Sequence, residues 1–172
     1  MSDLATHVVL LLALAAFVAG FIDSIAGGGG LIAIPALLLA GFSPAETLGT
    51  NKLQGLFGTT SSTLKYAANG HIDLRKGLPW AVMAAIGGGL GAFAATMIPI
   101  DAMRLILPFL LVGIALFFAL KPDLGDVDRA QRVTPLVLGL TVVPAIGFYD
   151  GLFGPGGGSF FMLSLVAMAG YG

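Results

Sequence analysis

Residues 20–30 read GFIDSIAGGGG, and residues 147–157 read GFYDGLFGPGG, so that an eleven-residue motif recurs 127 positions later in the chain. Six of the eleven positions are identical in the two copies. Glycine matches arise easily in a chain with 26 glycines, but a shared Phe-x-Asp element inside an apolar run does not. We therefore interpret the motif as an internal repeat, whose aspartates are Asp23 and Asp150.

The sequence around both copies is strongly apolar. Hydrophobic residues make up 57% of the 172 residues, charged residues make up 10%, and the mean hydropathy is +0.98. Soluble domains carry about 25% charged residues, so a soluble globular protein is excluded. Charge-free windows such as 77–100 and 105–120 are close to the length of about 20 residues that a membrane-spanning helix needs.

These windows predict helices, because an open sheet cannot satisfy its backbone in lipid and barrel strands would alternate polar and apolar residues. The expected fold class is all-α: a polytopic helical membrane protein with an internal repeat and with helices broken at the Gly-rich motifs. The predicted apolar helices are seven: 5–22, 31–42, 46–66, 77–98, 102–120, 133–150 and 157–170.

The repeat divides the chain into a first repeat of about five apolar segments (1–120), a linker (121–132) and the start of a second repeat (133–172). The second repeat is expected to be incomplete. Basic residues in the linker place it in the cytoplasm. If 31–42 crosses the membrane, five crossings precede the linker and the two copies are inverted, which is the arrangement we predict. If 31–42 is a re-entrant loop, the copies are parallel.

Charge and cysteine content exclude several classes of function. The net charge of −1 indicates no nucleic-acid partner, and the absence of cysteine excludes disulfides and thiolate chemistry. The sequence shows no hydrolase or metal-ligand constellation, so we expect neither an enzyme nor a cofactor.

The glycine runs at 27–30 and 154–158 are candidate binding segments. Four consecutive glycines cost roughly 1 kcal/mol each relative to alanine in a helix, which favours an unwound stretch. Irregular backbone at membrane depth is tolerated where it lines a cavity or is buried in protein. Its N–H groups, with the helices that follow from Leu31 and Ser159, would bind an anion. The alternative is a purely structural kink. By contrast, the Gly-x-x-x-Gly spacing of Gly87 and Gly91 predicts close helix packing.

Lys52 stands in the uncharged stretch LGTNKLQG, residues 48–55. An intramembrane lysine costs several kcal/mol unless it is paired, which makes it a candidate functional residue. The alternative is an interfacial lysine. Asp23 and Asp150 could pair with Lys52, accept hydrogen bonds from glycine N–H groups, or carry a proton. Together these arguments nominate the following substrate-binding residues: Asp23, Ser24, Gly27, Gly28, Gly29, Gly30, Asn51, Lys52, Asp150, Gly154, Gly156, Gly157, Gly158 and Ser159.

Three motifs, FIDSIAGGGGLIAIPAL (21–37), LGTNKLQ (48–54) and GPGGGSF (154–160), resemble the TauE/SafE sulfite-exporter family in order and spacing. The resemblance covers essentially the whole chain, although family members usually run longer. It implies a transporter of sulfite, sulfonates or related organosulfur anions in the bacterial plasma (inner) membrane.

The expected partners are a small anion and the lipid bilayer, with protons as a candidate coupling ion and a homo-oligomer as a candidate assembly. The alternative function is a non-transporting membrane scaffold or assembly subunit, in which the glycines serve packing.

Overall fold

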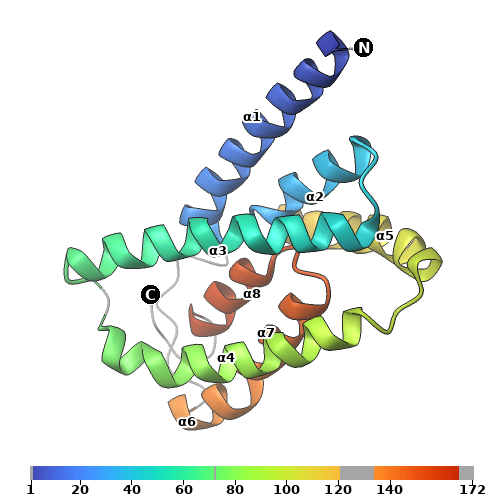
Figure 1. Cartoon of the computed structure of the whole chain (residues 1–172). Helices are drawn as coiled ribbons and strands as arrows, with labels where there is room; N and C mark the ends of the chain where they lie inside the picture. Colours follow the sequence, from blue (N-terminus) through green and yellow to red (C-terminus); the bar gives the residue numbers. More distant parts are fainter. Residues whose placement is uncertain (1, 72, 121–133, 167–172) are drawn as a thin grey trace.

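A computed structural model of the chain describes residues 2–71, 73–120 and 134–166, which form helices with no strand among them (Figure 1). The predicted all-α class is therefore confirmed, whereas the predicted linker 121–132 lies outside the described residues. Six of the seven predicted segments correspond to one helix each, whereas the described part of 133–150 contains α6, η2 and most of α7. The elements are α1 (Ser2–Ala26), α2 (Gly30–Leu39), α3 (Pro44–Ala68), α4 (Leu74–Ala95), α5 (Ile100–Leu120), α6 (Pro135–Val137), the π-helix η2 (Leu138–Val142), α7 (Val143–Leu152) and α8 (Gly157–Ser164).

Local sequence signals set both ends of α3. At its start, the Ser43 hydroxyl accepts a hydrogen bond from the Glu46 amide at 3.4 Å, and the Glu46 carboxylate accepts one from the Ser43 amide at 2.9 Å. This capping box satisfies amides that have no partner within the helix. Pro44 lies in the first turn, where the N–H group that proline lacks would have no partner within the helix. After the helix, Gly70 adopts a φ of +75°, which allows the chain to turn.

Three described helices are long and apolar enough to cross a membrane: residues 6–26 of α1, all of α4 and all of α5. Their large apolar side chains are widely exposed, as at Phe17 and Phe109, each 73% exposed. Such exposure fits contact with lipid rather than water. α3 is as long as α1, but it is richer in Gly, Ser and Thr and is not among these candidates. The chain is thus a multi-pass membrane protein.

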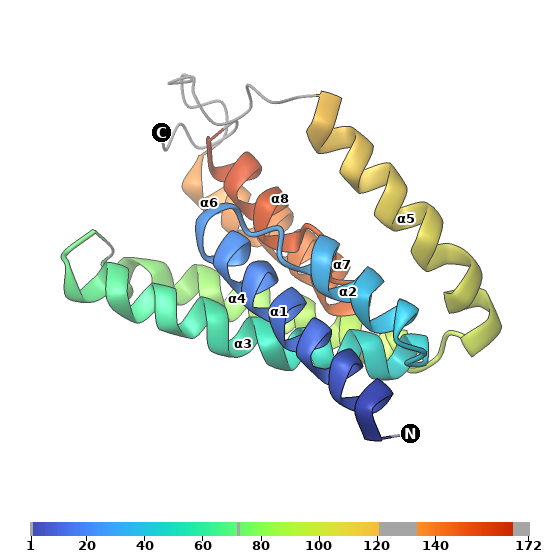
Figure 2. The same cartoon turned by 90° about the horizontal axis from the view of Figure 1, so that it is seen from above.

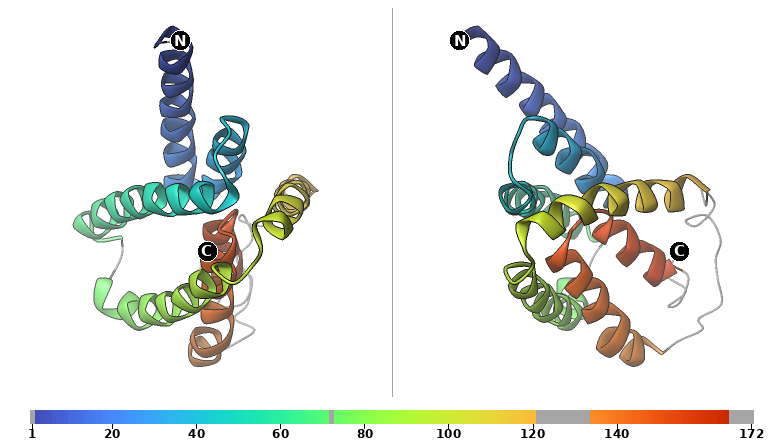
Figure 3. Two further views of the ribbon diagram at one scale, coloured as in Figure 1. Left: turned by 45° about the vertical axis from the view of Figure 1, so that its right-hand side comes forward. Right: turned by 90° about the vertical axis from the view of Figure 1, so that its right-hand side faces the viewer.

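The longest helices frame the molecule. α3 and α4 run in opposite directions, and α7 and α8 lie between them in both Figure 1 and the left view of Figure 3. α1 projects away from the other helices. A small core of Ile34, Leu48, Met103, Leu107 and Leu111 joins α2, α3 and α5.

α4 and α7 pack backbone to backbone. A β-carbon on Gly87 or Gly91 would clash with a carbonyl oxygen of α7, and one on Gly147 or Gly151 would clash with a carbonyl oxygen of α4. Two small-xxx-small faces therefore meet, which is the usual way for membrane helices to approach closely. The packing role predicted for Gly87 and Gly91 is confirmed.

Both Gly-rich motifs break a helix, as predicted, and in each case the chain folds back. α2 returns beside α1 (Figure 2), so that residues 8–12 and 36–40 border one apolar groove. α2 has 10 residues against 25 in α1 and covers less than half of its length. A short crossing and a re-entrant arm share this geometry, and the inverted direction of the second copy stays a prediction.

Candidate functional site

The two broken helices meet at their glycine runs. Gly27 and Gly158 are in direct contact, because a β-carbon on Gly158 would come within 2.6 Å of the Gly27 α-carbon. Ser159 joins them, since its amide donates to the Gly27 carbonyl at 3.2 Å and its hydroxyl donates to the Ala26 carbonyl at 2.7 Å. Segments 131 positions apart thus form a single junction.

Asp23 holds the first break in shape. Its carboxylate accepts a hydrogen bond from the Gly29 amide at 3.0 Å, just before α2 begins. Gly29 lies so close that a β-carbon there would stand 2.7 Å from the Asp23 β-carbon. A carboxylate at a helix N-terminus satisfies an otherwise unpaired N–H and complements the helix dipole. Three roles were considered for the two aspartates, and the one that the structure gives Asp23 is to accept a hydrogen bond from a glycine N–H.

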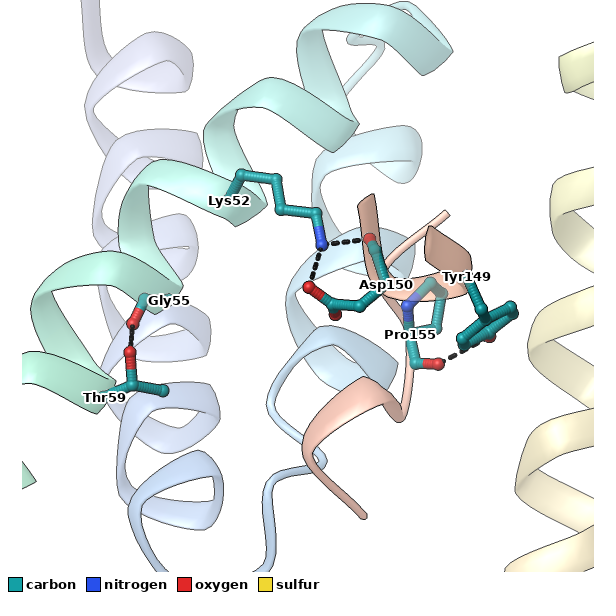
Figure 4. Close-up of polar contacts among 6 residues, drawn as sticks. All are labelled: Lys52, Gly55, Thr59, Tyr149, Asp150 and Pro155. Carbon is teal, nitrogen blue, oxygen red and sulfur yellow. Dashed lines mark hydrogen bonds and ion pairs between the residues drawn. The ribbon is translucent and has the colours of Figure 1, made fainter. Parts of the chain in front are cut away.

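The second break is closed by different contacts. The Tyr149 hydroxyl donates to the Pro155 carbonyl at 2.7 Å (Figure 4). The Tyr149 ring lies edge-on to that of Phe160, with centroids 5.5 Å apart. Gly156 adopts a φ of +71°, and Gly157 lies against the Asp150 carboxylate with no space for a side chain. These contacts fold α8 back onto the end of α7.

Lys52 of α3 pairs with Asp150 of α7. Its ammonium group donates to Asp150 Oδ2 at 2.6 Å and also to the Asp150 main-chain carbonyl (Figure 4). The two side chains are 36% and 38% exposed, so the ion pair is only partly buried. The pairing considered for Lys52 is confirmed with Asp150 as the partner.

An open cavity of about 310 Å³ lies where these elements meet. Nine of the nominated residues line it: Asp23, Gly27, Gly29, Gly30, Asn51, Lys52, Asp150, Gly154 and Gly158. Asn51 lies against both glycine runs, since a β-carbon on Gly30 would stand 3.3 Å from its Nδ2 atom and one on Gly154 would stand 3.4 Å from it.

The other five nominated residues do not line this cavity. Ser24 donates to the Phe21 carbonyl and faces a separate groove between α1 and α3. Gly28, Gly156, Gly157 and Ser159 shape the two breaks from behind the cavity wall. We selected these residues because they are polar or belong to the repeated motif. Whether each one faces the cavity depends on how the two hairpins fold.

Sequence reasoning missed Gln54, Thr59 and Phe161, which also line the cavity. For Thr59 a signal was present, because it lies seven positions after Lys52, two turns along the same helix face. Its hydroxyl donates to the Gly55 carbonyl at 2.7 Å (Figure 4). No local signal indicated Phe161, since its place depends on the fold of α8.

The cavity is chemically suited to holding a small polar ion. It is lined by the Lys52 ammonium group, by the Asn51 side-chain amide and by Gly158, whose main-chain N–H has no acceptor among the described residues. Gln54 also lines it, but its amide nitrogen donates to the Ala16 carbonyl at 2.7 Å. Its charged side chains are Lys52, Asp23 and Asp150. No group of three or more His, Cys, Asp or Glu that could hold a metal ion occurs in the part of the chain that the structure describes.

The contact between the glycine runs should be intolerant of a single methyl group. We expect Gly27→Ala to lower the free energy of unfolding by about 2 kcal/mol or more beyond Gly41→Ala, because overpacking adds to backbone strain. Both glycines have positive φ, +68° and +92°, but only Gly27 faces main-chain atoms, while Gly41 faces open space. Thermal unfolding in detergent measures the difference, and equal losses for the two variants would show that the runs do not touch.

The chain is similar to several proteins described as probable membrane transporters. It is 63% identical to "Probable membrane transporter protein ORF9" of Sinorhizobium sp. over 172 residues, which are 100% of this chain and 66% of the relative. It is 44% identical to a probable membrane transporter protein of Haemophilus influenzae over 169 residues (98% and 66%). It is also 44% identical to YfcA of Escherichia coli K12 over 156 residues (91% and 58%).

The chain therefore spans about two thirds of the length of the first two of these relatives. No solved protein structure matches it. The family model for the sulfite exporter TauE/SafE matches residues 12–172, which include both glycine runs, Lys52 and both aspartates. The match confirms the resemblance seen in the motifs: this chain belongs to the TauE/SafE sulfite exporter family.

Proposed function

We propose that the chain forms the substrate-binding part of a membrane transporter for small anions of the sulfite or sulfonate type. The observation that carries the proposal is the position of Lys52, whose ammonium group lies in a cavity at the junction of two broken helices. Cavities at paired helix breaks are where many membrane transporters bind their substrates.

Three kinds of donor support an anion rather than a neutral solute. Lys52 supplies a positive charge, Asn51 supplies an amide group, and Gly158 supplies a main-chain N–H at the start of α8. Charge-assisted hydrogen bonds are about twice as strong as neutral ones, so an oxyanion would gain most from this set. The substrate class itself comes from the family, whose model is named for sulfite export.

The names of the relatives support transport rather than catalysis, since each is described as a probable membrane transporter. The chain also has helices able to cross a bilayer, and the cavity lies between segments from both repeats. The rival function is a scaffold. It is favoured by the glycine contacts of α4 and α7, which serve packing and line no cavity that we describe.

Flux measurements separate the two functions. The purified chain is reconstituted into liposomes, and uptake of radiolabelled sulfite and methanesulfonate is compared with that of chloride and acetate. We expect saturable uptake of at least one sulfur oxyanion, above that of protein-free liposomes and above that of chloride and acetate. Uptake equal to protein-free liposomes for all four anions would support the scaffold.

Binding gives a second readout of the same site. A ligand at 100 times its Kd stabilises the folded state by about 2.7 kcal/mol, which raises the midpoint of thermal unfolding measurably. We expect sulfite or methanesulfonate to raise the midpoint in detergent, and chloride at equal ionic strength to leave it unchanged. Equal effects of all anions would indicate general screening rather than a site.

A further inference from the structure

We propose that Asp150 carries a proton with each transported anion, and that this proton releases Lys52 from Asp150 so that the ammonium group can bind the anion. The inference rests on the proposed function, since it names the ion coupled to transport at the same cavity. It starts from the charges in the cavity and from the different contacts of the two repeated aspartates.

The cavity as described already carries a net negative charge. Its charged lining residues are Lys52, with one positive charge, and Asp23 and Asp150, with one negative charge each. An anion that entered alone would raise the net negative charge of the cavity from one to two, which is unfavourable. A proton that enters with the anion leaves the net charge of the cavity unchanged.

The Lys52 ammonium group, the cation of the cavity, is already bonded to Asp150. Lys52 Nζ lies 2.6 Å from Asp150 Oδ2 and also donates to the main-chain carbonyl of the same residue. That carbonyl belongs to the last turn of α7, whose carbonyl groups lack partners within the helix. Two of the three ammonium N–H groups are given to Asp150, so an anion that binds more than one of them must displace an Asp150 oxygen.

The two aspartates of the repeat differ in this respect. Asp23 accepts the Gly29 amide at 3.0 Å and caps the start of α2, whereas Asp150 holds Lys52. A proton on Asp23 would not free the ammonium group, but a proton on Asp150 would. A neutral carboxyl group competes less well for the ammonium group, and its proton offsets the charge of the anion.

No other titratable group is placed to take this role among the described residues around Asp150. On α7, the neighbouring Tyr149 hydroxyl is bonded to Pro155. On α4, the charged residues Arg75 and Lys76 lie in the first turn and do not line the cavity. α8 and η2 contain no titratable side chain in their described residues.

A metal cation is less suited to the position than a proton. Two of the Asp150 oxygens, Oδ2 and the main-chain carbonyl oxygen, already accept hydrogen bonds from the Lys52 ammonium group. The balanced step is therefore simple. A proton from one aqueous side binds the Asp150 carboxylate, the Lys52 ion pair opens, and the ammonium group pairs with the anion. Release of the anion and the proton on the other side restores the pair.

Charge movement tests the inference in the wild-type chain. Methanesulfonate keeps one negative charge across the working pH range, so pH acts on the protein and not on the probe. In liposomes we expect its uptake to be driven by an inward proton gradient, to carry one proton per anion, and to be insensitive to membrane potential. If the chain carries sulfite but not methanesulfonate, the potential is varied for sulfite at equal pH on both sides.

Variants then locate the proton. Asp150→Asn removes the carrier, so that any remaining uptake becomes sensitive to potential and the protein takes up no proton when the anion binds in detergent. Asp23→Asn keeps the oxygen that accepts the Gly29 amide, and its flux stays insensitive to potential. Asp101→Asn, at a residue whose side chain is 95% exposed, is the matched control with wild-type behaviour.

The outcomes are distinguishable from a failure of the proposed function. No anion uptake by the wild type would reject transport itself. Uptake that follows the potential, without proton movement, would reject coupling to a proton, and uptake that depends on sodium would assign another cation. Proton uptake that persists in Asp150→Asn and is lost in Asp23→Asn would assign the proton to Asp23 and reject Asp150 as the carrier.

Discussion

Lys52→Gln is expected to abolish saturable uptake of the transported anion and to leave expression of the chain largely intact. A hydrogen bond to a charged group contributes about 1.5–3 kcal/mol, and each 1.4 kcal/mol is tenfold in affinity, so the loss of this donor alone weakens binding roughly 10- to 100-fold. The Asp150 carboxylate would also lose its partner and repel the incoming anion. The two losses act together on the same step.

Folding should tolerate this change. The Lys52 and Asp150 side chains are more than a third exposed, and ion pairs of that kind contribute about 1 kcal/mol or less to stability. Lys65→Gln, near the end of the same helix, is the matched control and should transport like the wild type. Uptake by Lys52→Gln at the wild-type rate would mean that the lysine does not contact the anion.

Gly91→Ala and Gly151→Ala are expected to separate α4 from α7 and to lower the free energy of unfolding by about 3 kcal/mol or more. In each case the added methyl group would meet main-chain atoms of the opposite helix. A side chain in such a position could rotate away, but a backbone carbonyl cannot, so the cost falls at or beyond the upper end of the 1–3 kcal/mol typical of overpacking.

Gly89→Ala provides the control on α4. Gly89 lies between Gly87 and Gly91 on α4, but no atom lies within 4 Å of a β-carbon added there. Because alanine is a better helix former than glycine by about 1 kcal/mol, this variant should unfold at the wild-type temperature or slightly above it. Equal midpoints for Gly89→Ala and Gly91→Ala would show that the two helices are not in contact.

The helices and their breaks could be predicted from the sequence because their causes are local. Long apolar runs without charge require helices in lipid, and consecutive glycines raise the cost of continuing them at 27–30 and 154–158. The capping box of α3 and the Gly70 turn are equally local. The contact of Gly87 and Gly91 was also accessible, since their spacing on one helix face needs a small-residue partner.

The roles within the cavity could not be predicted in the same way. Asp23 and Asp150 occupy the same place in a repeated motif and have the same local propensities, so sequence left three roles open for each of them. Their contacts differ because α3 brings Lys52 to Asp150, 98 positions away, while the Asp23 carboxylate accepts a hydrogen bond from Gly29 of its own hairpin. Likewise, Ser24 faces away from the cavity and Phe161 faces it because of how each hairpin folds back. Local sequence decides where a helix begins and ends, but the partner of a charged side chain depends on which distant segment the packing places beside it.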